Sequence, residues 1–168
     1  MARQLKPNMA LPPDHVKVVL KLSSDRARAV DALVALQGKG LTSLVWDPLA
    51  SRPLRITDVL PRPLAALFPS LRQLELRNLT VPPTWLRELS GLPALECLKL
   101  TFWKLSSAAT AGAAVRFPSL PSLAHLVMSV WPGPPELRMQ LDDLPALTEL
   151  VLGGGRAALL ASRPVPQL

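Results

Sequence analysis

A leucine pattern that recurs along most of this chain limits what the chain can fold into. The pattern is LxxLxL, and its clear copies begin about 24 to 28 residues apart, at Leu71, Leu95, Leu123 and Leu147. A looser copy begins at Leu41, and the stretch HVKVVLKL alternates in the same way. Repeats of this length are typical of folds that stack one supersecondary unit on the next. The sequence therefore predicts about six repeats, each with one strand.

Within each copy, the fourth and sixth positions are expected to share one buried face, because strand side chains alternate with a period of two. Four copies have a proline two residues before their first leucine, where a bend enters the strand. Proline suits that place because it fixes φ and lacks a backbone donor. The pattern predicts an α/β fold, in which a short, curved parallel sheet of about six strands carries helices and loops on its convex side.

The predicted organisation is one repeat domain at 14–155, after an N-terminal tail at 1–13 and before a C-terminal tail or incomplete cap at 156–168. Apolar residues make up 49% of the 168 residues, which is enough for a sizeable core. No stretch approaches 18 uninterrupted apolar residues, so no membrane span is expected. A single cysteine, Cys97, cannot form an internal disulfide, and this predicts a reducing, cytoplasmic setting.

Short helices are predicted between the strands. SDRARAVDALVALQGKG predicts a helix with Ser24 or Asp25 as its N-cap and Gly38 as its end. Its buried stripe is expected to contain Val30, Leu33 and Val34.

Three further segments predict shorter helices. TWLRELSG predicts one that is capped by Thr84, buries Leu86 and Leu89, and ends at Gly91. SSAATAGAAVRF predicts a weaker, alanine-rich helix. DVLPRPLAALF contains two prolines, so any helix there should be short and begin close to them.

The phrases ALFPSLRQLEL and LSGLPALECLKL are similar to the intracellular leucine-rich repeats of plant and green-algal proteins. The resemblance covers roughly residues 14–155. It implies a solenoid that binds a protein partner on its concave face, as a scaffold or a substrate receptor, in the cytoplasm and in some relatives at the cytoskeleton or ciliary axoneme. One feature departs from the family, which usually has Asn or Cys at the ninth place of each repeat. Those places hold Leu49, Leu79, Trp103, Trp131 and Gly155 here, with Asn78 one residue early, so we expect irregular curvature.

If the strands pair with their leucines in register, the side chains of the opposite face form columns across the sheet. The third-position column is Ser43, Gln73, Cys97, His125 and Glu149. The fifth is Val45, Glu75, Lys99, Val127 and Val151, and the seventh is Asp47, Arg77, Thr101, Ser129 and Gly153. The candidate partner-binding residues on this face are Gln73, Glu75, Arg77, Cys97, Lys99, Phe102, His125 and Glu149.

One set in these columns carries a chemical hypothesis. Cys97, His125 and Glu149 stand in the order that a thiol nucleophile, its base and an orienting carboxylate need, which leaves a thiol hydrolase as an alternative function. An open sheet face supplies neither a cleft nor oxyanion donors. One Cys, one His and one Glu without paired spacing are also a thin ligand set for a metal. We therefore predict a non-enzymatic protein with no catalytic residue, metal site or cofactor.

The net charge of +7 leaves nucleic acid as another alternative partner. The charged members of the predicted face, however, are mixed in sign, which favours a protein partner over a phosphate groove. At its end, the chain reads GGGRAALLASRPVPQL, with little polar sequence to cap a stack of repeats. The sequence predicts either self-association at that end or repeats missing from a longer protein.

Overall fold

The structure is a computed structural model of the chain. It describes residues 16–20, 26–38, 40–47, 54–60, 62–105, 115–130, 137–141, 143–153 and 157–160. The predicted N-terminal tail at 1–13 lies outside these residues.

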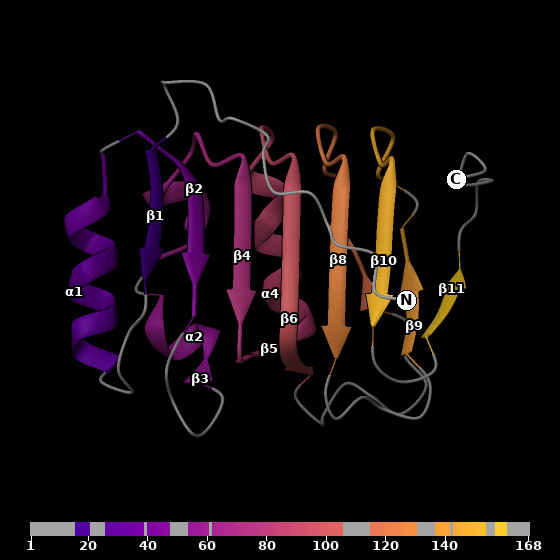
Figure 1. The fold of residues 1–168 in the computed structure, drawn as a ribbon, viewed down its shortest axis with the longest axis horizontal. Helices are drawn as coiled ribbons and strands as arrows, with labels where there is room; N and C mark the ends of the chain where they lie inside the picture. Colours follow the sequence, from indigo (N-terminus) through magenta and orange to yellow (C-terminus); the bar gives the residue numbers. More distant parts are fainter. Residues whose placement is uncertain are drawn as a thin grey trace, which may run out of the picture.

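A parallel sheet runs through the described chain, and its strands coincide with the predicted repeats. In spatial order the strands are β1 (Val16–Leu20), β2 (Leu41–Trp46), β4 (Gln73–Arg77), β6 (Cys97–Leu105), β8 (His125–Val130) and β10 (Glu149–Gly153) (Figure 1). All of these pairings are parallel. The sheet is open, with β1 and β10 at its two ends. The predicted α/β class with a parallel sheet is therefore confirmed.

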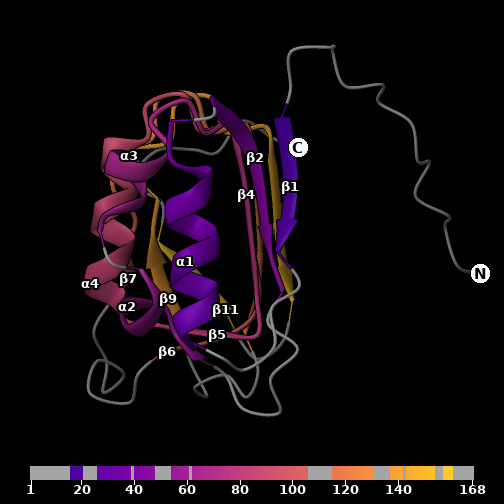
Figure 2. The same cartoon turned by 90° about the vertical axis from the view of Figure 1, so that its left-hand side faces the viewer.

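The helices form a second layer on one side of this sheet (Figure 2). They are α1 (Arg26–Leu36), α2 (Ile56–Val59), α3 (Leu64–Leu67), α4 (Pro83–Leu86) and the 3₁₀ helix η1 (Arg87–Gly91). Two short strands continue from the end of β6: β5 (Leu79–Val81) pairs with β6, and β3 (Leu54–Arg55) pairs with β5. A separate parallel set lies on the side of the helices and consists of β7 (Val115–Arg116), β9 (Leu137–Gln140) and β11 (Ala157–Leu160). β11 falls within the segment predicted as a C-terminal tail or incomplete cap. No helix in the described part of the chain is long and apolar enough to cross a membrane.

The core lies between the sheet and the helical layer. The sheet contributes to it the fourth and sixth positions of the repeats, which are at most 1% exposed from β2 to β8: Leu44, Trp46, Leu74, Leu76, Leu98, Leu100, Leu126 and Met128. The alternation of strand side chains places all of them on one face, as predicted. Burying a leucine side chain stabilises the fold by about 1.5–3 kcal/mol, so this ladder is a main source of stability.

Burial decreases at the β10 end of the sheet. The first leucine of the repeat is fully buried at Leu95 and Leu123 but 8% exposed at Leu147. On β10 itself, Leu150 and Leu152 are only partly buried, whereas Leu126 at the equivalent position of β8 is 0% exposed. Within the described residues, β10 has a paired strand on one side only, which accounts for the difference. The predicted self-association at this end stays a prediction.

Helix α1 has the predicted position, and its predicted buried face is correct in part. The predicted N-cap residues, Ser24 and Asp25, lie outside the described residues. Gly38 follows it with a φ of 76°, a conformation that glycine adopts without steric cost. Leu33 is fully buried, and Leu36 packs partly against the core. The prediction for Val34 was wrong, since its side chain is 48% exposed. The buried stripe runs from Leu33 to Leu36, three residues apart. Val34 directly follows Leu33, and the turn of about 100° per residue points its side chain toward solvent.

The other helix predictions were correct in part. TWLRELSG buries Leu86 and Leu89 as expected, but its helix begins at Pro83 with Pro82 as N-cap, not at Thr84. Proline is favoured at a first helical position because its φ is already helical and its missing donor is not needed there. Pro63 precedes the short helix α3 as predicted.

The alanine-rich segment SSAATAGAAVRF was predicted as a weak helix, but a strand lies near its end. Residues 106–114 lie outside the described residues, and the two that follow them form strand β7, not a helix. Val115 pairs with Met139 of β9, and a β-branched residue suits this extended pairing.

Asn78 marks the turn after β4. Its φ is 48°, in the left-handed region that asparagine tolerates better than most residues. Its backbone N–H donates to the carbonyl oxygen of Thr101 at 3.0 Å. The next residue, Leu79, is fully buried in place of the polar residue that is usual in the resembled family. The bend at Asn78 lets the chain leave the main sheet and begin β5.

Candidate interaction surface

The strand register brings the predicted columns together. Ser43 pairs with Gln73, Gln73 with Cys97, Cys97 with His125, and His125 with Glu149. The fifth-position column from Val45 to Val151 is aligned by the same pairings, and so is the seventh-position column from Arg77 to Gly153. Asp47 directly follows β2, at the end of the seventh column. Since positions four and six point into the core, these columns lie on the side away from the helices.

We call this side the helix-free face and define it by the third, fifth and seventh columns. Its burial is uneven. Ser43 is only 3% exposed and Val45 only 9%, whereas Val151 at the other end of the face is 44% exposed. Arg77, Lys99, His125 and Glu149 are exposed, and Gln73, Glu75 and Cys97 are half-buried. The face is therefore most enclosed over β2 and most open over β10.

Charged side chains on this face pair both along one strand and across neighbouring strands. Arg77 contacts Glu75 at 2.6 Å and Asp47 at 3.3 Å. The hydrogen bond to Glu75 is the main reason why the pKa of Arg77 is raised. Next to the columns, Arg72 and Glu96 form an ion pair at 3.0 Å. The mixed charges are thus paired locally, with Glu75 and Asp47 sharing the guanidinium group of Arg77.

His125 and Glu149 form a further cross-strand contact. The Nδ1 atom of His125 lies 2.9 Å from a carboxylate oxygen of Glu149, and both side chains are exposed. The contact links β8 to β10 on the helix-free face. It orients the imidazole toward β10, the strand on the side opposite Cys97.

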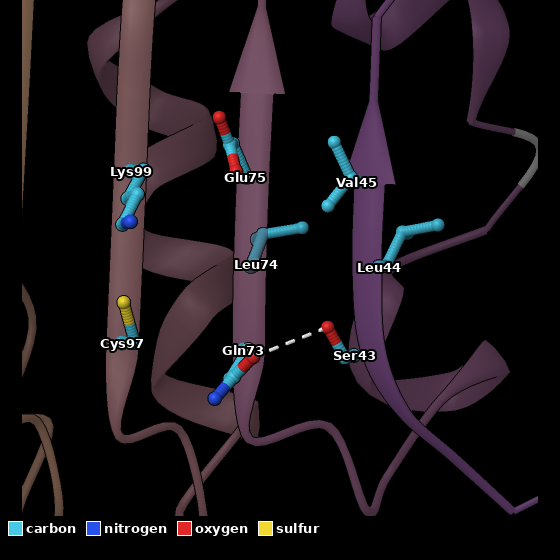
Figure 3. Close-up of a pocket in the computed structure, with 8 residues that line it drawn as sticks. All are labelled: Ser43, Leu44, Val45, Gln73, Leu74, Glu75, Cys97 and Lys99. Atoms are coloured by element: carbon cyan, nitrogen blue, oxygen red, sulfur yellow. Dashed lines mark hydrogen bonds between the residues drawn. The ribbon is translucent and has the colours of Figure 1, made fainter. Parts of the chain in front are cut away.

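A shallow pocket of about 150 Å³ lies over β2, β4 and β6. Its lining residues are Ser43, Leu44, Val45, Gln73, Leu74, Glu75, Cys97 and Lys99 (Figure 3). The Ser43 hydroxyl donates to the Gln73 side-chain oxygen at 3.3 Å across its floor. The polar groups that line the pocket are the hydroxyl of Ser43, the amide of Gln73, the carboxylate of Glu75 and the ammonium group of Lys99.

The Cys97 thiol is not activated in this arrangement. Burial raises its pKa, the positive charge of Lys99 lowers it, and the nearby Glu75 and Glu149 raise it again. Among the described residues no hydrogen bond joins the thiol to His125, although their backbones are paired. A nucleophilic thiol needs the opposite, a lowered pKa and an engaged base. The described residues also contain no group of three or more side chains suited to hold a metal ion.

The structure places most of the predicted binding residues but not all. The backbone of Phe102 lies in β6, and its side chain is outside what the structure describes. The sequence interpretation missed Ser43 and Val45 as pocket residues. It also missed the pairing of Arg72 with Glu96. Both members of that pair occupy second positions of neighbouring repeats, so the repeat register already contained the signal.

No protein-family model matches this sequence, and neither a curated protein nor a solved structure matches it. The relation to leucine-rich repeats therefore stays an expectation that rests on the residues themselves. A role for the helix-free face must be argued from its geometry.

Proposed function

We propose that this chain is a leucine-rich-repeat solenoid that acts as a non-enzymatic interaction module and binds a protein partner on the helix-free face. The single observation that carries the proposal is the register of the columns, which gathers side chains from β2 to β10 into one continuous surface. Stacked repeats commonly bind partners through such extended surfaces.

The chemistry of the face supports a protein partner. Its charges are mixed and locally paired, as in the Arg77 cluster with Glu75 and Asp47. Val127 and Val151 add apolar area beside these charges. Mixed charge around apolar contacts gives specificity in protein interfaces. Nucleic-acid binding instead needs several uncommitted cations along a groove.

The scaffold or substrate-receptor role, and the cytoplasmic, cytoskeletal or axonemal setting, rest on the resemblance to plant and green-algal repeats alone. The alternative as a thiol hydrolase has less support, because the thiol of Cys97 has a raised pKa and no hydrogen bond to His125 in the described residues.

A matched capture experiment tests the proposal. One variant carries Gln73→Ala, Lys99→Ala and His125→Ala on the helix-free face. The control carries Arg55→Ala, Arg62→Ala and Arg87→Ala, three exposed residues in or next to the helices of the other layer. Wild type and both variants are used to capture proteins from a native lysate that has been treated with nuclease. Any captured protein is then purified, and its affinity for all three chains is measured.

The proposal expects a protein that binds wild type and control alike and loses at least tenfold in affinity for the face variant. Equal binding of both variants would show that the contact lies elsewhere. A parallel capture from an untreated lysate gives the comparison: recovery that is seen only without nuclease, or that disappears in 0.5 M salt, would favour the nucleic-acid alternative instead. Thermal unfolding of all three chains checks that the variants remain folded.

A further inference from the structure

Among the described side chains of the helix-free face, the basic groups other than Lys99 are paired with carboxylates. Arg77 is held by Glu75 and Asp47, and His125 by Glu149. In the described part of the chain, Lys99 has no ion pair, although its strand neighbour is Glu75. The Glu75 carboxylate instead accepts from Arg77, with both contacts, at 2.6 and 2.7 Å, on one carboxylate oxygen. An exposed ammonium group at the rim of the pocket is therefore left uncommitted.

The neighbours of Lys99 on its other side are apolar. Lys99 pairs with Val127 of β8, and Val127 pairs with Val151 of β10. Val127 is half-buried, and Val151 is one of the few exposed large apolar side chains of the described residues, at 44%. The fifth column thus presents one cation followed by two aliphatic side chains across adjacent strands.

We propose that Lys99, Val127 and Val151 bind an extended segment of the partner that carries a carboxylate and, two residues later, an aliphatic side chain. This proposal rests on the proposed function and names the chemistry of its partner. The carboxylate pairs with the Lys99 ammonium group at the rim of the pocket. The aliphatic side chain packs over the two valines.

The spacing of the sheet fits a segment that crosses the strands. Neighbouring strands lie about 4.8 Å apart, so Val127 and Val151 are about 5 and 10 Å from Lys99 along the column. In an extended segment, side chains two residues apart point to the same side and are about 6.6 Å apart. A carboxylate over Lys99 therefore brings the second side chain above the space between the two valines.

A single uncommitted cation among the described side chains of this face also selects the class of anion. A nucleic-acid backbone gains affinity from several Lys or Arg contacts to successive phosphates. Here the neighbouring arginines are occupied by carboxylates, as Arg72 is by Glu96. One carboxylate with an adjacent apolar group is the simpler complement to one ammonium group with adjacent valines.

Three capped peptides test this inference on the full chain. They are Ser-Glu-Ala-Leu-Ser, the same peptide with Gln in place of Glu, and the same peptide with Lys in that place. Each is titrated into ¹⁵N-labelled protein, and Kd is obtained from the amide shifts. We expect shifts centred on the amides of Lys99, Val127 and Val151. The Glu peptide should bind about two- to fivefold more tightly than the Gln peptide, the range of an exposed ion pair.

Substitutions of Lys99 distinguish an ion pair with the peptide from binding that does not depend on this charge. Lys99→Met should remove the preference for Glu over Gln, because it keeps the aliphatic stem without the charge. Lys99→Glu should reverse the preference, so that the Lys peptide binds best. Arg62→Met, which removes an exposed cation between α2 and α3, should leave all three affinities unchanged. A reversed preference requires a folded protein, so loss of structure cannot imitate it.

Equal affinity of wild type for the Glu and Gln peptides, or shifts located away from the fifth column, would overturn the inference. So would an oligonucleotide, poly(U), that shifts the same amides and displaces the Glu peptide. These results are distinguishable from failure of the proposed function. If the capture experiment finds a partner that binds wild type but not the face variant, the proposed function remains supported. This holds even if the peptides show no charge preference.

Discussion

Gly91 faces Ala65 so closely that a methyl group on Gly91 would lie 2.6 Å from the Cβ of Ala65. Gly91 ends η1, and Ala65 lies in α3, so this contact joins the helical segments of two neighbouring repeats. Gly91 does not need a positive φ, which means that space alone excludes a side chain.

Gly91→Ala should therefore destabilise the fold by about 1–3 kcal/mol, the usual cost of overpacking a close contact. Urea unfolding followed by circular dichroism measures the change. The double variant with Ala65→Gly removes the opposing methyl group and should recover part of the loss, less about 1 kcal/mol for a glycine within a helix. No recovery in the double variant would show that the contact is not the cause.

Reaction of Cys97 with iodoacetamide should be slow at pH 7.5 and should accelerate only well into the alkaline range. Burial raises the pKa of the thiol, so the reactive thiolate is scarce at neutral pH. Lys99→Met removes the charge that lowers this pKa, and the rate should then fall about threefold for charges about 7 Å apart in a water-like medium. Mass spectrometry of the labelled protein gives both rates. A thiolate that titrates below pH 7 would support the thiol-hydrolase alternative.

Arg77 should contribute to stability mainly through its two carboxylate partners. Arg77→Gln leaves Glu75 and Asp47 without their cation, and the expected loss is about 0.5–1 kcal/mol because all of these groups are partly exposed. A double-mutant cycle with Asp47→Asn, measured at 20 mM and 500 mM NaCl, isolates the longer contact. The coupling should shrink at high salt, since salt screens exposed charges. A coupling that does not depend on salt would argue against an electrostatic origin.

The fourth-position leucines should differ in their contribution along the sheet. Leu98 is fully buried on β6, and Leu98→Ala should cost about 2.7–5 kcal/mol. Leu150 occupies the same position of the repeat on β10 but is only partly buried, so Leu150→Ala should cost less, about 1–2 kcal/mol. Both values come from urea unfolding at one protein concentration. Equal losses would contradict the decrease in burial toward β10.

A large part of the fold follows from the leucine pattern. The pattern predicted the strands and, through a common register, which residues become neighbours. Cys97 beside His125 and Glu75 beside Lys99 are examples that the pairings confirm. The prediction succeeds because alternation along a strand is local and every repeat uses the same buried positions.

Helix ends and faces were less predictable. Val34 and Leu36 are both apolar, and only packing against the core decided which of them turns inward. Thr84 is a good N-cap in general, yet Pro83 begins the helix because its φ is already helical. Local preferences for a helix end or a buried face differ by little in free energy, so packing against the rest of the molecule decides between them.

For the candidate surface, the sequence by itself determined which side chains share the helix-free face and in what order. Only the tertiary structure decided how these side chains pair: Arg77 takes Glu75 and Asp47, His125 takes Glu149, and Lys99 is left over. It also decided that Ser43 is buried while Val151 is exposed. The period of a strand sets the direction of each side chain, but its contacts depend on rotamers and on neighbours that lie 24 to 30 residues away in the chain.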